Sequence, residues 1–105
     1  MNRFDVVRNG DSASQRRVPY LLIVQSELLA DFPTHVVVPL IRQKGVGSTP
    51  ASLLNPRFDI ENETLVMFTQ QLAGLPKRYL GKLVCNLEAQ QNTIVRALDF
   101  LFDGI

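Results

Sequence analysis

Few residues of this 105-residue chain have side chains suited to catalysis or metal binding. The single histidine, His35, comes directly before three valines, and no cysteine or carboxylate lies at ligand spacing from it. We therefore expect His35 to be structural or to lie at the surface. The single cysteine, Cys85, precedes a predicted helix, whose N-terminus can lower a thiol pKa. Because no CxxC or Cys/His pattern accompanies it, a buried and inert thiol is the preferred interpretation.

Three acidic residues, Asp59, Glu61 and Glu63, cluster at a predicted hairpin. The oxygen-ligand pattern of a calcium loop is missing, which favours a solvated turn over a metal site. Gly45 and Gly47 lack the strand–helix context and the lysine of a phosphate-binding loop. The sequence therefore predicts a binding protein that is not an enzyme and uses no cofactor or metal.

Composition predicts one globular domain over residues 1–105, since 46% of the residues are hydrophobic and 20% are charged. A net charge of +1 without a long basic run argues against a dedicated nucleic-acid binder. The polar N-terminus does not resemble a signal peptide, and no apolar run approaches membrane-spanning length. We expect a cytoplasmic protein that does not contact membranes.

The hydrophobic pattern predicts several strands followed by one terminal helix. Strands without intervening helices favour antiparallel pairing in a curved sheet or small open barrel, and the fold class is α+β, mainly β. Continuous hydrophobicity over residues 18–25 predicts burial on both faces, and Pro39 indicates an edge, a bulge or a switch between sheets. The expected strands are Phe4–Val7, Val18–Gln25, His35–Ile41, Arg57–Ile60, Thr64–Thr69 and Pro76–Val84.

The final helix is predicted to begin near Leu87, after Asn86 as its N-cap, and to end at Asp103 before a glycine cap. Asp99 and Asp103 lie one turn apart near the negative end of the helix dipole, which costs about 0.5–1 kcal/mol. This acidic end is either a contact surface for a cationic partner or a solvated helix end. The angular position of Phe102 on the helix leaves open whether it faces solvent or packs at the seam with a second copy of the chain. An apolar stripe for packing on the sheet comprises Leu87, Ile94, Leu98, Leu101 and Ile105.

Four motifs, taken together, resemble the CcdB family of bacterial toxins, the toxin half of type II toxin–antitoxin pairs. Each motif is short, but their joint order covers essentially the whole chain and ends at the same residue. The motifs are VQSELL at residues 24–29, VPL at 38–40, TQQLAGLP at 69–76 and ALDFLFDGI at 97–105.

The resemblance implies a homodimer with an SH3-like antiparallel β-barrel, a small accessory sheet and one C-terminal α-helix. It also implies binding to the A subunit of DNA gyrase, which traps the cleaved gyrase–DNA complex and blocks replication. A CcdA-like antitoxin neutralises such a toxin, and the two repress their operon together. Operator DNA is therefore contacted only through the antitoxin.

Residues carried over from the family form two sets. Leu28 and Leu29 belong to the gyrase-facing set, and an isolated turn cannot bury both, so we expect one of them to be exposed. The antitoxin is expected to meet Arg16, Arg17 and Lys44 with acidic side chains. The resemblance implies gyrase contacts at Leu28, Leu29, Asp99, Phe102, Asp103, Gly104 and Ile105.

One departure from the family concerns Asp103, where the best-known members carry a tryptophan that stacks on a gyrase arginine. This chain has no tryptophan. A weakly toxic or non-toxic homologue that acts as an antitoxin decoy or corepressor is therefore an alternative. An unrelated small β-barrel protein-binding module is a second alternative. A ribonuclease is disfavoured, because no His/Glu/Arg constellation is evident.

Overall fold

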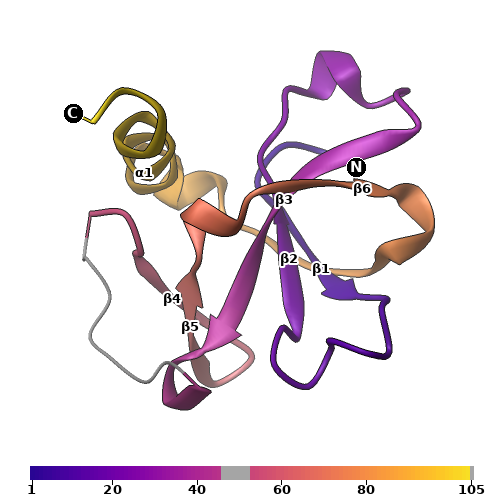
Figure 1. Cartoon of the computed structure of the whole chain (residues 1–105), viewed down its shortest axis with the longest axis horizontal. Helices are drawn as coiled ribbons and strands as arrows, with labels where there is room; N and C mark the ends of the chain where they lie inside the picture. Colours follow the sequence, from indigo (N-terminus) through magenta and orange to yellow (C-terminus); the bar gives the residue numbers. More distant parts are fainter. Residues whose placement is uncertain (46–52, 105) are drawn as a thin grey trace.

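The computed structural model describes residues 1–45 and 53–104. These residues form seven strands, one α-helix and five short 3₁₀ turns, which confirms the predicted α+β, mainly β fold of SH3-like type. The strands and helix are β1 Asp5–Asn9, β2 Tyr20–Ile23, β3 Thr34–Arg42, β4 Arg57–Ile60, β5 Glu63–Met67, β6 Ala73–Pro76, β7 Leu80–Asn86 and α1 Gln91–Asp103 (Figure 1). The 3₁₀ turns are η1 Glu27–Leu29, η2 Gln43–Gly45, η3 Thr69–Gln71, η4 Lys77–Tyr79 and η5 Glu88–Gln90.

All strands belong to one antiparallel sheet in the order β4-β5-β3-β2-β1-β7, from which β6 branches at β3. The first half of β3 pairs with β6, and its last three residues pair with β5. Pro39 lies between these segments, and its carbonyl accepts from the Phe68 amide at 3.0 Å. The missing amide of Pro39 therefore falls where β3 changes partner. Pro39 thus marks a change of partner within one sheet and not the predicted switch between two sheets. An edge position is also wrong, because β2 pairs with β3 at Pro39.

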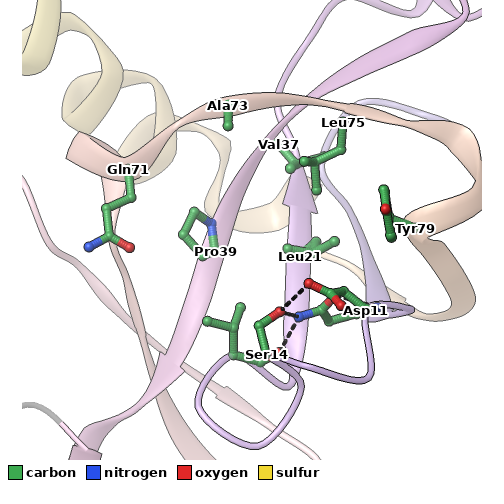
Figure 2. Close-up of a pocket in the computed structure, with 11 residues that line it drawn as sticks. Asp11, Ser14, Leu21, Val37, Pro39, Gln71, Ala73, Leu75 and Tyr79 are labelled. Carbon is green, nitrogen blue, oxygen red and sulfur yellow. Dashed lines mark hydrogen bonds between the residues drawn. The ribbon is translucent and has the colours of Figure 1, made fainter.

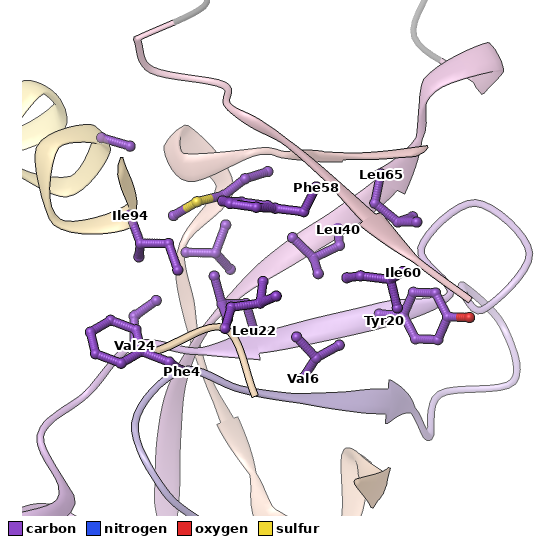
Figure 3. Packing of buried hydrophobic residues seen from close by; sticks show 14 of the residues in the cluster. Phe4, Val6, Tyr20, Leu22, Val24, Leu40, Phe58, Ile60, Leu65 and Ile94 are labelled. Carbon is purple, nitrogen blue, oxygen red and sulfur yellow. The ribbon is translucent and has the colours of Figure 1, made fainter. Parts of the chain in front are cut away.

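The curled sheet has a hydrophobic core on each face. The larger core fills the inside of the curl, where Leu22 and Phe58 meet Ile94 of α1 (Figure 3). The smaller core includes Leu21 and Val37 on the opposite face. Every residue of β2 is buried, as its continuous hydrophobicity predicts.

The helix begins later than predicted, at Gln91 instead of Leu87. The N-cap residue of α1 is Gln90, so the prediction of Asn86 as its N-cap is wrong. The Asn86 side-chain oxygen instead accepts from the amide of Glu88, the first residue of the 3₁₀ turn η5, at 2.8 Å. At the other end, Gly104 has a φ of 72° and its amide donates to the Phe100 carbonyl at 3.0 Å, as predicted for a glycine cap. Of the predicted stripe, Leu87, Ile94 and Leu98 are buried, Leu101 is half-buried and Ile105 lies outside the described residues.

The predicted strand over residues 76–84 is wrong in its extent. β6 ends at Pro76 and β7 begins at Leu80, with η4 between them, so most of β6 lies before the predicted strand, where none was expected. Gly81 lies in β7 where β1 approaches closely: a Cβ there would lie 2.8 Å from the Arg8 carbonyl oxygen. No helix within the described ranges is long and apolar enough to cross a membrane.

Candidate functional site

The C-terminal end of α1 presents an aromatic ring and two carboxylates. Phe102 is 67% exposed in the single chain, which agrees with either predicted position, in solvent or at the seam of a dimer. Asp99, Asp103 and Gly104 are exposed as well, and neither aspartate forms an ion pair with another described residue. Ile105 lies outside the described residues. The helix end therefore offers negative charge beside an apolar surface.

A second exposed apolar position lies on η1 and is held by the polar residues that precede it. The Ser26 hydroxyl accepts from the Leu28 amide at 3.2 Å. The Gln25 amide group donates to the Leu29 carbonyl at 3.2 Å and accepts from the Val36 amide at 3.0 Å, which ties the turn to β3. As a result Leu28 is 94% and Leu29 39% exposed, in agreement with the expectation that both cannot be buried.

The turn η1 and the helix end lie at the same end of the molecule but on different sides of it (Figure 1). In a single chain these two apolar positions therefore lie apart from each other (Figure 1). Sequence reasoning missed Phe32, which is 57% exposed beside η1 and whose amide donates to the Leu29 carbonyl at 3.0 Å. Its place between Asp31 and Pro33, in a polar turn, was a usable signal of exposure.

The predicted basic residues lie on two loops that Arg42 connects. The Arg42 guanidinium donates to the Arg16 carbonyl at 2.8 Å and pairs with Glu63 at 2.9 Å. Arg17 follows in the same loop as Arg16, and Lys44 lies on η2 directly after β3. Arg16, Arg17 and Lys44 are all exposed, so the end of β3 brings their two loops together.

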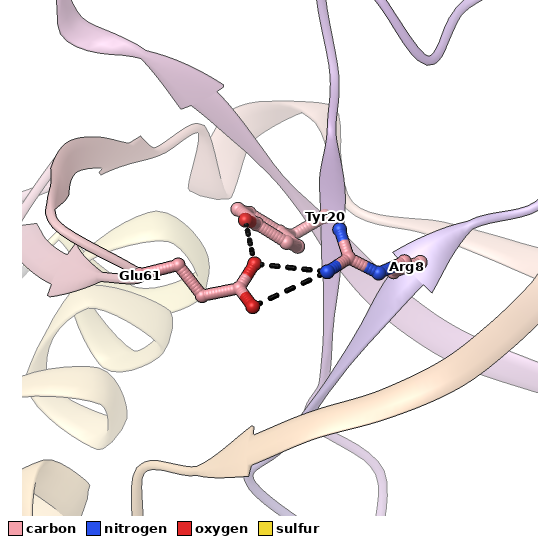
Figure 4. A network of polar contacts seen from close by, with 3 residues as sticks. All are labelled: Arg8, Tyr20 and Glu61. Carbon is pink, nitrogen blue, oxygen red and sulfur yellow. Dashed lines mark hydrogen bonds and ion pairs between the residues drawn. The ribbon is translucent and has the colours of Figure 1, made fainter.

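Sequence reasoning also missed a polar network that joins the β4–β5 turn to β1 and β2 (Figure 4). The Tyr20 hydroxyl donates to the Glu61 carboxylate, and the Arg8 guanidinium pairs with the same carboxylate at 3.1 Å. Glu61 has a φ of 50° and Asn62 one of 65°, which is the geometry of a tight two-residue hairpin turn. The network therefore fixes the tip of this hairpin against strands that are not its neighbours in the sheet.

The network shifts the pKa of both acidic groups. Burial first, and then the hydrogen bond and charge of Glu61, raise the pKa of the Tyr20 hydroxyl. The hydrogen bond from Tyr20, with help from Arg8, lowers the pKa of the Glu61 carboxyl. The acidic residues predicted to form a solvated turn thus have separate partners: Glu61 pairs with Arg8, Glu63 with Arg42, and Asp59 accepts from the Thr64 hydroxyl at 2.9 Å.

His35 and Cys85, the two residues considered for catalysis from the sequence, differ in burial, since His35 is buried whereas Cys85 is only half-buried. His35 is buried in β3, and within the described parts of the chain neither of its ring nitrogens has a hydrogen-bond partner. Burial, with the nearby charges of Glu61 and Asp5, raises the pKa of the Cys85 thiol. This direction agrees with the inert thiol preferred from the sequence and opposes activation by a helix N-terminus.

Comparison with known protein families gives a match for this chain. The family model described as CcdB protein matches residues 3–104, which is nearly the whole chain. The match includes all the strands, the helix and both exposed apolar positions. The chain therefore belongs to the CcdB family, a family of toxin–antitoxin toxins that poison DNA gyrase.

Proposed function

We propose that this chain is the toxin of a type II toxin–antitoxin pair and acts in the cytoplasm as a homodimer. In this proposal it binds the A subunit of DNA gyrase, traps the cleaved gyrase–DNA complex and blocks replication. Membership of the CcdB family supports the proposal. The observation that carries it is the exposure of large apolar side chains on η1 and at the end of α1.

The proposed gyrase-binding surface combines these two positions. Leu28 and Phe102 supply apolar area for burial, and Asp99 and Asp103 supply charge for cationic side chains of gyrase. The two aspartates repel each other in the free chain, so a cation between them relieves a local cost. The full proposed surface is Leu28, Leu29, Asp99, Phe102, Asp103, Gly104 and Ile105.

The antitoxin is proposed to bind the basic loops at the end of β3. Arg16, Arg17 and Lys44 are exposed and none of them pairs with an acidic residue in the described ranges. An acidic, flexible antitoxin segment complements this charge. Toxin and antitoxin together then repress their operon, with operator DNA contacted by the antitoxin.

Controlled expression in bacteria tests the toxin proposal. Induction of the chain alone is expected to arrest growth and to produce cleaved gyrase–DNA complexes, and co-expression of its antitoxin is expected to restore growth. Growth arrest without cleaved complexes would place the target elsewhere. Normal growth combined with tight antitoxin binding would favour the second candidate below.

The second candidate function is an antitoxin decoy or corepressor without toxicity, and Asp103 is the observation that favours it. A tryptophan at this position can stack on an arginine, a contact of about 1–2 kcal/mol when desolvated. Asp103 offers a charge-assisted hydrogen bond instead but loses apolar area. We expect Asp103→Trp to strengthen growth arrest relative to the native chain. Equal and strong arrest by both proteins would contradict this interpretation.

A further inference from the structure

We propose that a pocket beside β6 binds an apolar side chain of an acidic, extended peptide supplied by the antitoxin. This proposal rests on the proposed function and adds an apolar anchor to the contact with the basic loops. The pocket is open, has a volume of about 390 Å³ and lies on the face of the sheet that carries the smaller core. Leu21, Val37 and Pro39 form its floor, and Ala73 and Leu75 of β6 form one wall (Figure 2).

The opposite wall is a loop whose polar groups are already engaged with one another. The Asn9 amide group donates to the Ser14 hydroxyl and to the Val18 carbonyl, both at 2.9 Å. The Asp11 carboxylate accepts from the Ala13 amide and from the Ser14 hydroxyl, each at 3.1 Å. These bonds hold the wall in place before any ligand arrives. Recognition therefore depends on the apolar floor and on the charges around the pocket.

Three arginines adjoin residues that line the pocket, and one carboxylate, that of Asp11, belongs to the lining itself. Tyr79 lines one end, and the Arg78 guanidinium carbon lies 4.8 Å from the centroid of its ring. On the loop side, Arg16 and Arg17 directly precede Val18, which also lines the pocket. None of these three arginines pairs with an acidic side chain in the described ranges. Three unpaired arginines outnumber the single Asp11 carboxylate, and this excess of positive charge near an apolar floor favours a ligand with acidic residues beside an apolar one.

The wall formed by β6 suits an extended ligand. Within the described residues β6 pairs with β3 alone, and Ala73 and Gly74 are both exposed. A Cβ added at Gly74 would meet nothing within 4 Å, so the backbone is open to approach. An extended peptide can add to such a strand edge while one of its side chains enters a neighbouring pocket.

Nuclear magnetic resonance titration with synthetic peptides tests the proposal. The probe is a capped peptide with two leucines between pairs of glutamates. Its control peptides carry serines for the leucines or lysines for the glutamates. We expect amide shifts at Ala73, Leu75 and Tyr79, and at least tenfold weaker binding of both controls. Equal binding of the lysine peptide, or shifts confined to the end of α1, would overturn the proposal.

Three variants of the chain complete the test. Ala73→Trp fills the pocket and is expected to weaken peptide binding at least tenfold, and Arg78→Glu is expected to weaken it about threefold to tenfold. The matched control, Lys82→Glu on the exposed part of β7, is expected to bind within twofold of the native chain. Circular dichroism verifies that each variant is folded. Unchanged peptide binding by Ala73→Trp would overturn the proposal. A sedimentation coefficient that differs between Ala73→Trp and the native chain would also overturn it, because it would show that the pocket is covered by a second copy of the chain.

A growth assay separates this inference from the proposed toxin activity. Ala73→Trp is expected to arrest growth like the native chain but to be rescued less by the antitoxin. Full rescue of Ala73→Trp by the antitoxin would contradict the pocket proposal and leave the gyrase proposal unaffected. Absence of toxicity in the native chain, with peptide binding intact, would contradict only the gyrase proposal.

Discussion

The substitution Leu28→Ala tests whether Leu28 contacts gyrase without contributing to the stability of the fold. Because its side chain is almost fully exposed, Leu28→Ala is expected to change the free energy of unfolding by less than about 0.5 kcal/mol. Burial of a leucine side chain against a partner contributes about 1.5–3 kcal/mol. The same substitution is therefore expected to weaken gyrase inhibition by about 10- to 150-fold.

The matched control is Leu83→Ala, since Leu83 is 63% exposed on β7, outside the proposed gyrase surface. Purified variants are compared by urea unfolding and by titration into a gyrase supercoiling reaction. Leu83→Ala is expected to inhibit gyrase like the native chain. Full inhibition by Leu28→Ala, or equal losses in both variants, would refute the assignment of η1 to the gyrase contact.

Three further predictions concern the packing and the polar groups of the fold. Ile94→Ala removes a fully buried side chain between α1 and the sheet. It is expected to lower the free energy of unfolding, measured in urea titrations, by about 2–5 kcal/mol. A loss below about 1 kcal/mol would contradict the packing of α1 on the sheet. Because the folded pKa of Glu61 is lowered and that of Tyr20 raised, stability is expected to fall as the pH drops below about 4.5 and as it rises above 10. Tyr20→Phe is expected to reduce the alkaline fall in unfolding titrations across pH and to leave the part that the raised pKa of Cys85 contributes. An unchanged profile would refute the network. Alkylation of Cys85 in the folded chain is expected to reach its half-maximal rate above pH 9.0, and a midpoint below the one measured in urea would contradict its burial.

Local sequence signals predicted the fold class because they depend on residues close in the chain. Burial of the strand around Leu22 follows from its continuous hydrophobicity, and the glycine cap at Gly104 follows from a conformation that glycine favours. The first residue of the helix was harder to predict from the sequence. Leu87 is buried like a helix residue, but it lies before a 3₁₀ turn, and a buried leucine is compatible with both structures.

Features that depend on the curl of the sheet could not be predicted from the sequence. Arg8 and Glu61 are 53 residues apart and meet only because the β4–β5 hairpin folds back towards β1. The strand β6 was missed because Ala73 and Gly74 have low strand propensity, and pairing with β3 outweighs that preference. The exposure of Phe102 depends on how α1 is rotated against the sheet, which periodicity leaves ambiguous.

The most direct test of the central claim is the detection of covalent gyrase–DNA complexes in a reaction with the purified chain. Plasmid, gyrase and ATP are incubated with increasing amounts of the chain, and cleaved DNA is released with detergent and protease. The proposed function predicts linear DNA that increases with the native chain and is strongly reduced with Leu28→Ala. Plasmid that stays uncleaved at every concentration of folded chain, together with no binding to the gyrase A subunit, would contradict the claim.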